Sequence, residues 1–201
     1  MKLFPVAAVG LAILASAPRH ATAGDVENGI LAELNFARTH PSDYARTLRR
    51  DAEADHARLG WSRSAGEDSD ALDEAIDFLT RQEPLRPLHH NPRLTAMAQT
   101  YVAEQGPSGE IGHVGPGGEG FSERLRSLGA QPSMAGEDIS YGYSSPGEVV
   151  RQLIIDSGVP GRGHRQNIFT GAFQAAGASC GRHTVYRSMC VIDFAGGFVG
   201  R

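Results

Sequence analysis

The order of helical and strand patterns along the chain is the feature that most constrains its fold. Apolar residues recur at helical spacing through the first two thirds of the 201-residue sequence, whereas strand-like runs fall mostly in the last third. A parallel βαβ array would need the two patterns to alternate, so this order favours an α+β or layered α/β domain. We therefore expect an α+β fold.

Capping residues mark the helix starts. Ser145-Pro146-Gly147-Glu148 is a capping box with proline at the first helical position, and Asn91 followed by Pro92 offers a similar start. Seven glycines within residues 106–120 predict a loop there. The polar residues 49–68 are expected to form a variable, irregular insertion over the surface, between helices that the periodicity places near residues 25–48 and 69–79.

The N-terminus has the pattern of a secretory signal peptide. Lys2 supplies a positive charge, residues 6–16 are small or apolar, and Ala21-Thr22-Ala23 fits the small-x-small cleavage pattern. An apolar run of about eleven residues is too short for a membrane span, which needs roughly 20. We expect residues 1–23 to be removed, leaving residues 24–201 as a single secreted domain, extracellular or periplasmic, with no transmembrane segment.

Composition excludes some partners. The chain has 19 Lys+Arg against 23 Asp+Glu and a formal net charge of −4, which is too mild and too mixed to indicate nucleic acid or an anionic membrane surface. Residues 115–120 fit Gly-x-Gly-x-x-Gly, but they follow no predicted strand and begin Gly-Pro. No nucleotide cofactor is expected.

The sequence has two cysteines, Cys180 and Cys190. Because an exported protein meets an oxidising compartment, we expect an intrachain disulfide, with two buried free thiols as the alternative. Both cysteines lie in predicted strands joined by residues 181–187, so the bridge would pin neighbouring strands and stabilise them.

Asp156 is anomalous because it follows Val149 and Leu153 on the apolar stripe of a predicted helix. A buried carboxylate is costly unless it is paired. Either the helix ends near Ser157 and leaves Asp156 in water, or Asp156 faces a cleft and has a cationic or metal partner.

Two histidines are candidate partners, His164 eight residues later and His113 in the glycine-rich loop. Imidazoles and carboxylates that converge can hold a divalent metal such as zinc, or act as acid and base. The spacing alone does not show that they converge, and the usual short metal and hydrolase signatures are missing.

Several segments together resemble the CAP superfamily, which is named for cysteine-rich secretory, antigen 5 and pathogenesis-related 1 proteins. The resemblance spans nearly the whole exported chain and is closest to the short bacterial members. It rests on these segments in order: residues 34–45, residues 85–94, Gly112-His113, Ala135-Gly136-Glu137-Asp138-Ile139 and Gly163-His164-Arg165 with Asn167-Ile168.

This resemblance implies a three-layer α-β-α sandwich with a small antiparallel central sheet. It also implies a cleft with two histidines and two acids. By motif, His113 and His164 match the histidines, Glu137 matches the first acid, and Asp156 matches the second. Family members commonly have asparagine where this chain has Asp138, and often glutamate where it has Asp156.

Two functions follow as expectations. The first is a binding module, in which His113 and His164 hold zinc or another divalent metal, Glu137 and Asp156 orient them, and an extracellular ligand (lipid or sterol, cell wall or protein) binds nearby. The second is a metal-assisted hydrolase in which Glu137 or Asp156 is the catalytic base. A third reading is a purely structural polar network. Because the family resemblance does not imply a particular reaction, we favour binding over catalysis.

Overall fold

The computed structural model describes residues 23–59, 69–129 and 132–197. The expected signal peptide, apart from Ala23, lies outside these residues, as do residues 60–68. In chain order the elements are α1 (Ala23–Thr39), α2 (Pro41–Leu59), α3 (Ser69–Arg81), β1 (His89–His90), α4 (Pro92–Ser108), α5 (Phe121–Ser127), β2 (Ala135–Tyr141), α6 (Pro146–Ile155), the 3-10 turn Pro160–Arg162, α7 (Gly163–Ile168), β3 (Ala175–His183) and β4 (Arg187–Ala195).

One four-stranded sheet forms the middle of the molecule, in the order β1-β3-β4-β2. Strands β3, β4 and β2 are antiparallel neighbours, whereas the two-residue β1 joins the other edge of β3 in parallel. β2 is therefore an edge strand, and its residues 135–141 pair with residues 189–195 of β4. This pairing matters for the site, since two of the site's acidic side chains come from β2.

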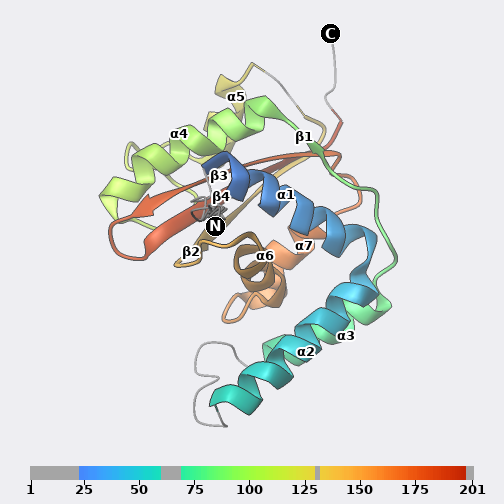
Figure 1. Cartoon of the computed structure of the whole chain (residues 1–201). Coiled ribbons are helices and arrows are strands. Elements are labelled where there is room, and N and C mark those ends of the chain that lie inside the picture. Colours follow the sequence, from blue (N-terminus) through green and yellow to red (C-terminus); the bar gives the residue numbers. More distant parts are fainter. Residues whose placement is uncertain (1–22, 60–68, 130–131, 198–201) are drawn as a thin grey trace, which may run out of the picture.

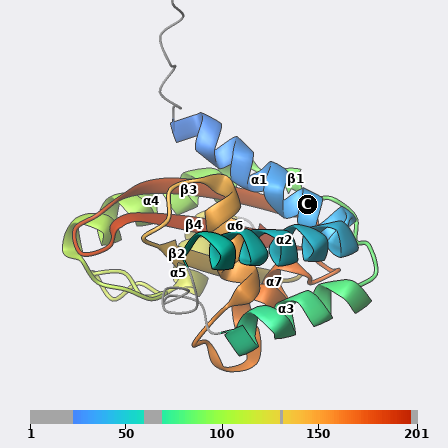
Figure 2. The ribbon, with the colours of Figure 1, turned by 60° about the horizontal axis from the view of Figure 1, so that its bottom comes forward.

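Helices cover both faces of the sheet, as Figures 1 and 2 show. α4 lies along β3 and β4 on one face, and α1, α6 and α7 lie on the other. Side chains alternate along β4: Met189 and Val191 pack with α4, whereas Ile192 and Phe194 join the larger core with α1 and α6. The expected α+β class and the α-β-α layers are confirmed.

A glycine sets how closely α4 approaches the sheet. A Cβ atom at Gly177 on β3 would lie 2.2 Å from the backbone nitrogen of Thr95 in α4. Any side chain at this position would push the helix away. Asp193, directly opposite Gly177 on β4, is fully buried on this face.

The two predicted helix caps are present. The Asn91 side chain accepts hydrogen bonds from the backbone nitrogens of Arg93 and Leu94 at the start of α4. The Ser145 hydroxyl accepts one from the backbone nitrogen of Glu148 at the start of α6. Each cap satisfies N–H groups that have no partner within the helix.

Two boundaries differ from the sequence-based expectation. Residues 49–59, expected to be irregular, continue α2 as a helix. This stretch contains alanine, arginine, leucine and acidic residues and has no glycine or proline before Gly60, so helix propensity outweighs its lack of apolar periodicity. Likewise α4 runs through Gly106 and Pro107, so the glycine-rich loop begins only at Gly109, which caps the helix in the left-handed conformation with φ 75°.

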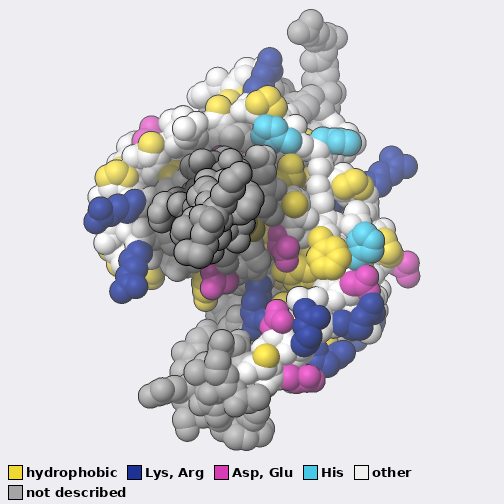
Figure 3. All heavy atoms as spheres, in the orientation of Figure 1, with side chains coloured by type: hydrophobic (Ala, Val, Ile, Leu, Met, Phe, Trp, Pro, Cys, Tyr) yellow, Lys and Arg dark blue, Asp and Glu magenta, His cyan; other side chains and the backbone are white. Residues whose placement is uncertain are grey.

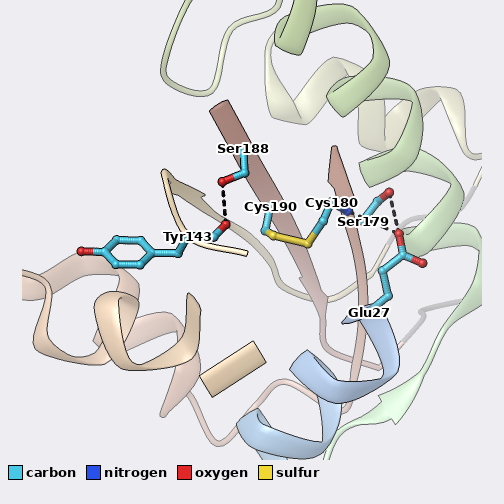
Figure 4. Close-up of a disulfide and its surroundings, with 6 residues drawn as sticks. All are labelled: Glu27, Tyr143, Ser179, Cys180, Ser188 and Cys190. Atoms are coloured by element: carbon cyan, nitrogen blue, oxygen red, sulfur yellow. Dashed lines mark hydrogen bonds between the residues drawn. A yellow bond between two sulfur atoms is a disulfide. The ribbon is translucent and has the colours of Figure 1, made fainter. Parts of the chain in front are cut away.

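The predicted disulfide is confirmed and joins the two central strands. Cys180 and Cys190 are directly opposite in the β3–β4 register, with Cα atoms 4.1 Å apart. Figure 4 shows how α1 is attached at the same place: the Glu27 carboxylate accepts hydrogen bonds from the Ser179 hydroxyl at 2.9 Å and the Cys180 backbone nitrogen at 3.3 Å. The bridge thus reinforces both the hairpin and the packing of α1 on it.

Charges of both signs share the surface. On the face seen in Figure 3, basic and acidic side chains lie next to each other over α2 and α3. Glu74 of α3 bonds Arg162 at 2.8 Å and Arg165 at 2.9 Å, which attaches α3 to the segment around α7. Among the described residues, no helix is both long and apolar enough to cross a membrane.

Candidate functional site

His113 pairs with Glu137 on the α4 side of the sheet. Nδ1 of His113 lies 2.9 Å from Oε1 of Glu137, which projects from β2. The loop is held beside the strand because the Gly112 carbonyl accepts hydrogen bonds from the Tyr101 hydroxyl at 2.6 Å and the Gln105 amide at 2.9 Å. The imidazole is half exposed, whereas the Glu137 side chain is only 2% exposed.

Arg124 of α5 neutralises Glu137 within the protein. Its Nη2 donates to both carboxylate oxygens, at 2.8 Å and 2.6 Å, and its Nη1 donates to the carbonyls of His113 and Glu119 at 3.1 Å. The guanidinium lies 3.6 Å from the centre of the Tyr101 ring. Arg124 therefore fixes the acid, the backbone of the histidine and the end of the glycine-rich loop together.

His164 pairs with Asp156 on the other side. The Asp156 Oδ1 lies 2.6 Å from Nδ1 of His164, and Oδ2 accepts a hydrogen bond from the backbone nitrogen of His164 at 3.0 Å. Asp156 is 0% exposed. Of the two alternatives for Asp156, the structure combines parts of each: α6 does end there, yet the carboxylate is buried and paired with the predicted histidine.

The chain reaches this geometry because α6 stops abruptly. Asp156 adopts the left-handed conformation, with φ 57° and ψ 41°, which turns the backbone toward α7. Aspartate tolerates this conformation better than most residues do. Arg165 then donates to the free carbonyls of Ile154 at 2.6 Å and Ile155 at 2.9 Å, and Arg162 donates to the Asp156 carbonyl at 2.8 Å. These arginines satisfy the end of the helix.

The surroundings of His164 favour its protonated form. Burial lowers the pKa of the imidazole, but the hydrogen bond to Asp156 and the charges of Asp138 and Asp156 raise it by more, so the net shift is upward. The side chain is 18% exposed. His164 therefore acts as a titratable counter-charge to Asp156.

Asp138 interacts electrostatically with both pairs. It follows Glu137 on β2, so the two side chains point to opposite faces of the sheet. Oδ1 of Asp138 accepts a hydrogen bond from the Asn167 amide at 2.7 Å, and Oδ2 has no partner among the described residues. Burial raises the pKa of Asp138 to about 8, and the charges of Asp156 and Glu137 add to the increase.

The structure thus arranges the four predicted site residues as two pairs, His113 with Glu137 on the α4 side of the sheet and His164 with Asp156 on the other side. Across the described parts of the chain, no group of three or more His, Cys, Asp or Glu side chains is arranged to hold a metal ion. In both pairs Nδ1 faces a carboxylate, so a proton on Nδ1 leaves a lone pair on Nε2 that can accept a hydrogen bond or bind a metal.

Sequence reasoning missed several members of the site. Arg124 gave no signal, since an arginine on a short, polar helix is usually exposed. Asp138 was noted only as a departure from the family's asparagine. Asp193 could have been found, because it is a carboxylate within the apolar run Cys190-Val191-Ile192-Asp193-Phe194 of β4.

Comparison with known proteins finds similar solved structures and one matching family model. Among solved structures, similar folds include an extracellular protein with an SCP domain from Bacillus anthracis str. Ames (22% identity, TM-score 0.45, covering 55% of this chain and 34% of that one). They also include an outer surface protein from Borrelia burgdorferi (16% identity, TM-score 0.48, covering 64% of this chain and 88% of that one). A third is a cysteine-rich secretory protein from Staphylococcus aureus subsp. aureus Mu50 (13% identity, TM-score 0.42, covering 66% of this chain and 40% of that one).

This chain spans about a third of the Bacillus protein's length and two fifths of the Staphylococcus protein's. A search of the curated proteins found no significant match. The CAP model, which describes the cysteine-rich secretory protein family, matches residues 33–194, a range that holds all of the sheet except Ala195 and all four predicted site residues. The chain belongs to the cysteine-rich secretory protein (CAP) family.

Proposed function

We propose that this chain is an exported binding module whose two carboxylate-bound histidines hold a divalent metal ion such as zinc, next to the place where an extracellular ligand binds. The observation that carries the proposal is the hydrogen-bonding pattern that the two imidazoles share. In both His113 and His164, Nδ1 is engaged by a buried carboxylate. Metal-binding histidines usually have this second hydrogen bond, because it fixes the tautomer and directs Nε2 at the metal.

The residues present fit a metal only as a two-histidine site. Both oxygens of Glu137 accept hydrogen bonds from Arg124, and both oxygens of Asp156 accept them from His164. The acids therefore orient the histidines and are not available as ligands themselves. A metal bound there would keep open positions for water or for a ligand atom, and it would supply a Lewis acid to whatever binds.

The same contacts favour binding over hydrolysis. A general base needs a carboxylate oxygen that can take a proton from water. In this site each carboxylate oxygen of Glu137 and Asp156 already accepts a hydrogen bond from the protein. We therefore assign both acids an orienting role.

Metal binding is tested by zinc titration calorimetry on the protein lacking residues 1–23. We expect one zinc per chain, with binding lost in His113→Ala and in His164→Ala and retained in His90→Ala, an exposed histidine on β1. Zinc must displace a proton from His164, whose pKa is raised, so affinity should increase with pH. Equal binding by wild type and both site variants would refute the metal site.

Export is a separate part of the proposal. The signal-like N-terminus and the Cys180–Cys190 disulfide both support an oxidising destination. Mass spectrometry of protein expressed from the full gene should find a chain beginning at Gly24 outside the cytoplasm. An unprocessed chain that stays inside the cell would contradict it. The ligand classes that remain candidates are lipid or sterol, cell wall and protein.

A further inference from the structure

Asp193 is a buried acid next to the His113–Glu137 pair that the proposed function does not use. It lies on β4 directly opposite Glu137 on β2, and directly opposite Gly177 on β3. Side chains at opposite positions of antiparallel strands lie on the same face of the sheet, with Cβ atoms roughly 5 Å apart. Asp193 is 0% exposed, and α4 covers this face.

Its carboxyl group lacks the donors that a buried carboxylate needs. Within the described residues, no N–H or O–H group donates to either oxygen of Asp193. The side chain directly opposite it on the same face of the sheet is the carboxyl of Glu137. Two ionised carboxylates cannot hydrogen-bond to each other, so a hydrogen bond between them requires a proton on one.

The donors around the pair indicate which acid carries that proton. Glu137 accepts two hydrogen bonds from Arg124 and faces Nδ1 of His113, and these contacts stabilise its anion. Asp193 is desolvated and has no such contacts, which favours its neutral form. Burial and then the charge of Glu137 raise the pKa of Asp193 well above its usual value, against the opposing charge of Arg124.

We propose that Asp193 is a neutral carboxylic acid whose O–H donates a hydrogen bond to the Glu137 carboxylate, so that Asp193 acts as a positioning residue for His113. Glu137 then receives hydrogen bonds from three elements: α5 through Arg124, the loop through His113, and β4 through Asp193. This fixes the rotamer of Glu137 and, through it, the ring orientation of His113. The assignment does not depend on metal binding, and it is tested on metal-free protein.

The charged groups that act on Asp193 are few. β2 contributes Glu137 and, more weakly, Asp138, whose side chain points to the opposite face. α5 contributes Arg124, and the neighbouring position on β3 is Gly177, which has no side chain. None of these groups supplies Asp193 with a hydrogen-bond donor.

Infrared spectroscopy tests the protonation directly. A protonated carboxyl has a C=O stretching band that a carboxylate lacks, so metal-free wild-type protein at pH 7 should show such a band from Asp193. The band should be lost in Asp193→Asn and retained in Asp138→Asn, which removes the other neutral acid. If the Asp193→Asn spectrum keeps every protonated-carboxyl band of the wild type, the proposal is overturned.

The positioning role is tested by the ring nitrogen signals of His113 in NMR spectra. Asparagine keeps a neutral donor opposite Glu137, so Asp193→Asn should retain the wild-type tautomer and titration of His113. Asp193→Leu removes the donor and should shift both. Because the leucine variant could fail to fold, the asparagine variant carries the test: if it shifts the His113 signals as much as loss of Glu137 in Glu137→Gln does, Asp193 does not act as a neutral donor.

Discussion

The two imidazole–carboxylate pairs differ in how the charge of the acid is balanced. Glu137 has a permanent counter-charge in the buried guanidinium of Arg124, so His113 is not needed to neutralise it. Asp156 has its hydrogen bonds from His164, whose charge depends on pH. The charge balance of the His113–Glu137 pair is therefore independent of the histidine, whereas that of the His164–Asp156 pair changes when the histidine is protonated. Both pairs nevertheless consist of an imidazole and a carboxylate.

The two pairs also differ in how deeply their histidines are buried. His113 is 50% exposed and His164 is 18% exposed, while both acids are almost completely buried. The exposed histidine is supported by the arginine-bound acid, and the more buried histidine lies on the other side of the sheet, where the charge of Asp138 acts on it. This difference in exposure and charge balance predicts that substitutions and changes of pH will destabilise the two pairs by different amounts.

The largest effect is expected from Arg124→Met. Removing the guanidinium leaves the buried Glu137 carboxylate without its counter-charge, and breaking a buried ion pair on one side costs about 3–5 kcal/mol. Chemical denaturation at neutral pH measures the loss. Arg126→Met on the same helix is the matched control, since its ion pair with Glu123 is exposed and should contribute about 0–1 kcal/mol. Equal losses in the two variants would remove the basis for the comparison.

A smaller and unequal effect is expected when each histidine is removed in turn. His164→Ala takes both a partner and a counter-charge from Asp156, which is 0% exposed, and should cost about 1–3 kcal/mol. His113→Ala leaves Glu137 with Arg124 and should cost less than about 1 kcal/mol. Chemical denaturation of both variants under identical conditions measures the two losses of stability. A larger loss in His113→Ala would reverse the ranking of the two halves.

The pH dependence should separate the halves further. Because the folded-state pKa of His164 is raised above 6.5, its contribution to stability is complete below that value and is lost as pH rises through the folded pKa. NMR titration should show this raised pKa in the wild type. Asp156→Asn keeps a residue that tolerates the left-handed conformation but removes the charge, so it should lower the pKa of His164. An unchanged titration would show that Asp156 is not the cause.

The smallest effect at neutral pH is expected for Asp138→Asn, and it should grow with pH. The pKa of Asp138 is raised from 3.8 to about 8, so the stability gained from its proton is lost as pH rises from about 4 to about 8. Asparagine keeps the acceptor for Asn167 and cannot ionise. The Tm of wild type should fall more than that of the variant between pH 5 and pH 9. Parallel curves would mean that Asp138 is not held neutral.

The sequence by itself determined much of the framework, because the relevant signals are local. Capping residues at Asn91 and Ser145 predicted where α4 and α6 begin, since a side-chain oxygen there satisfies N–H groups of the next turn. The family motifs indicated the two histidines and the two acids. The polar stretch 49–59 was misjudged because its helix depends on propensity and length and has no apolar stripe to reveal it.

Only the tertiary structure decided how the charges of the site are balanced. Arg124 and Glu137 are 13 residues apart in sequence, and Asp193 lies 56 residues beyond Glu137; they meet because β2 pairs with β4 and α5 packs beside both. Burial, which raises the pKa of Asp138, likewise depends on the helices packed around β2. Sequence spacing specifies neither desolvation nor cross-strand register, and these two quantities determine which acids are ionised and which are neutral.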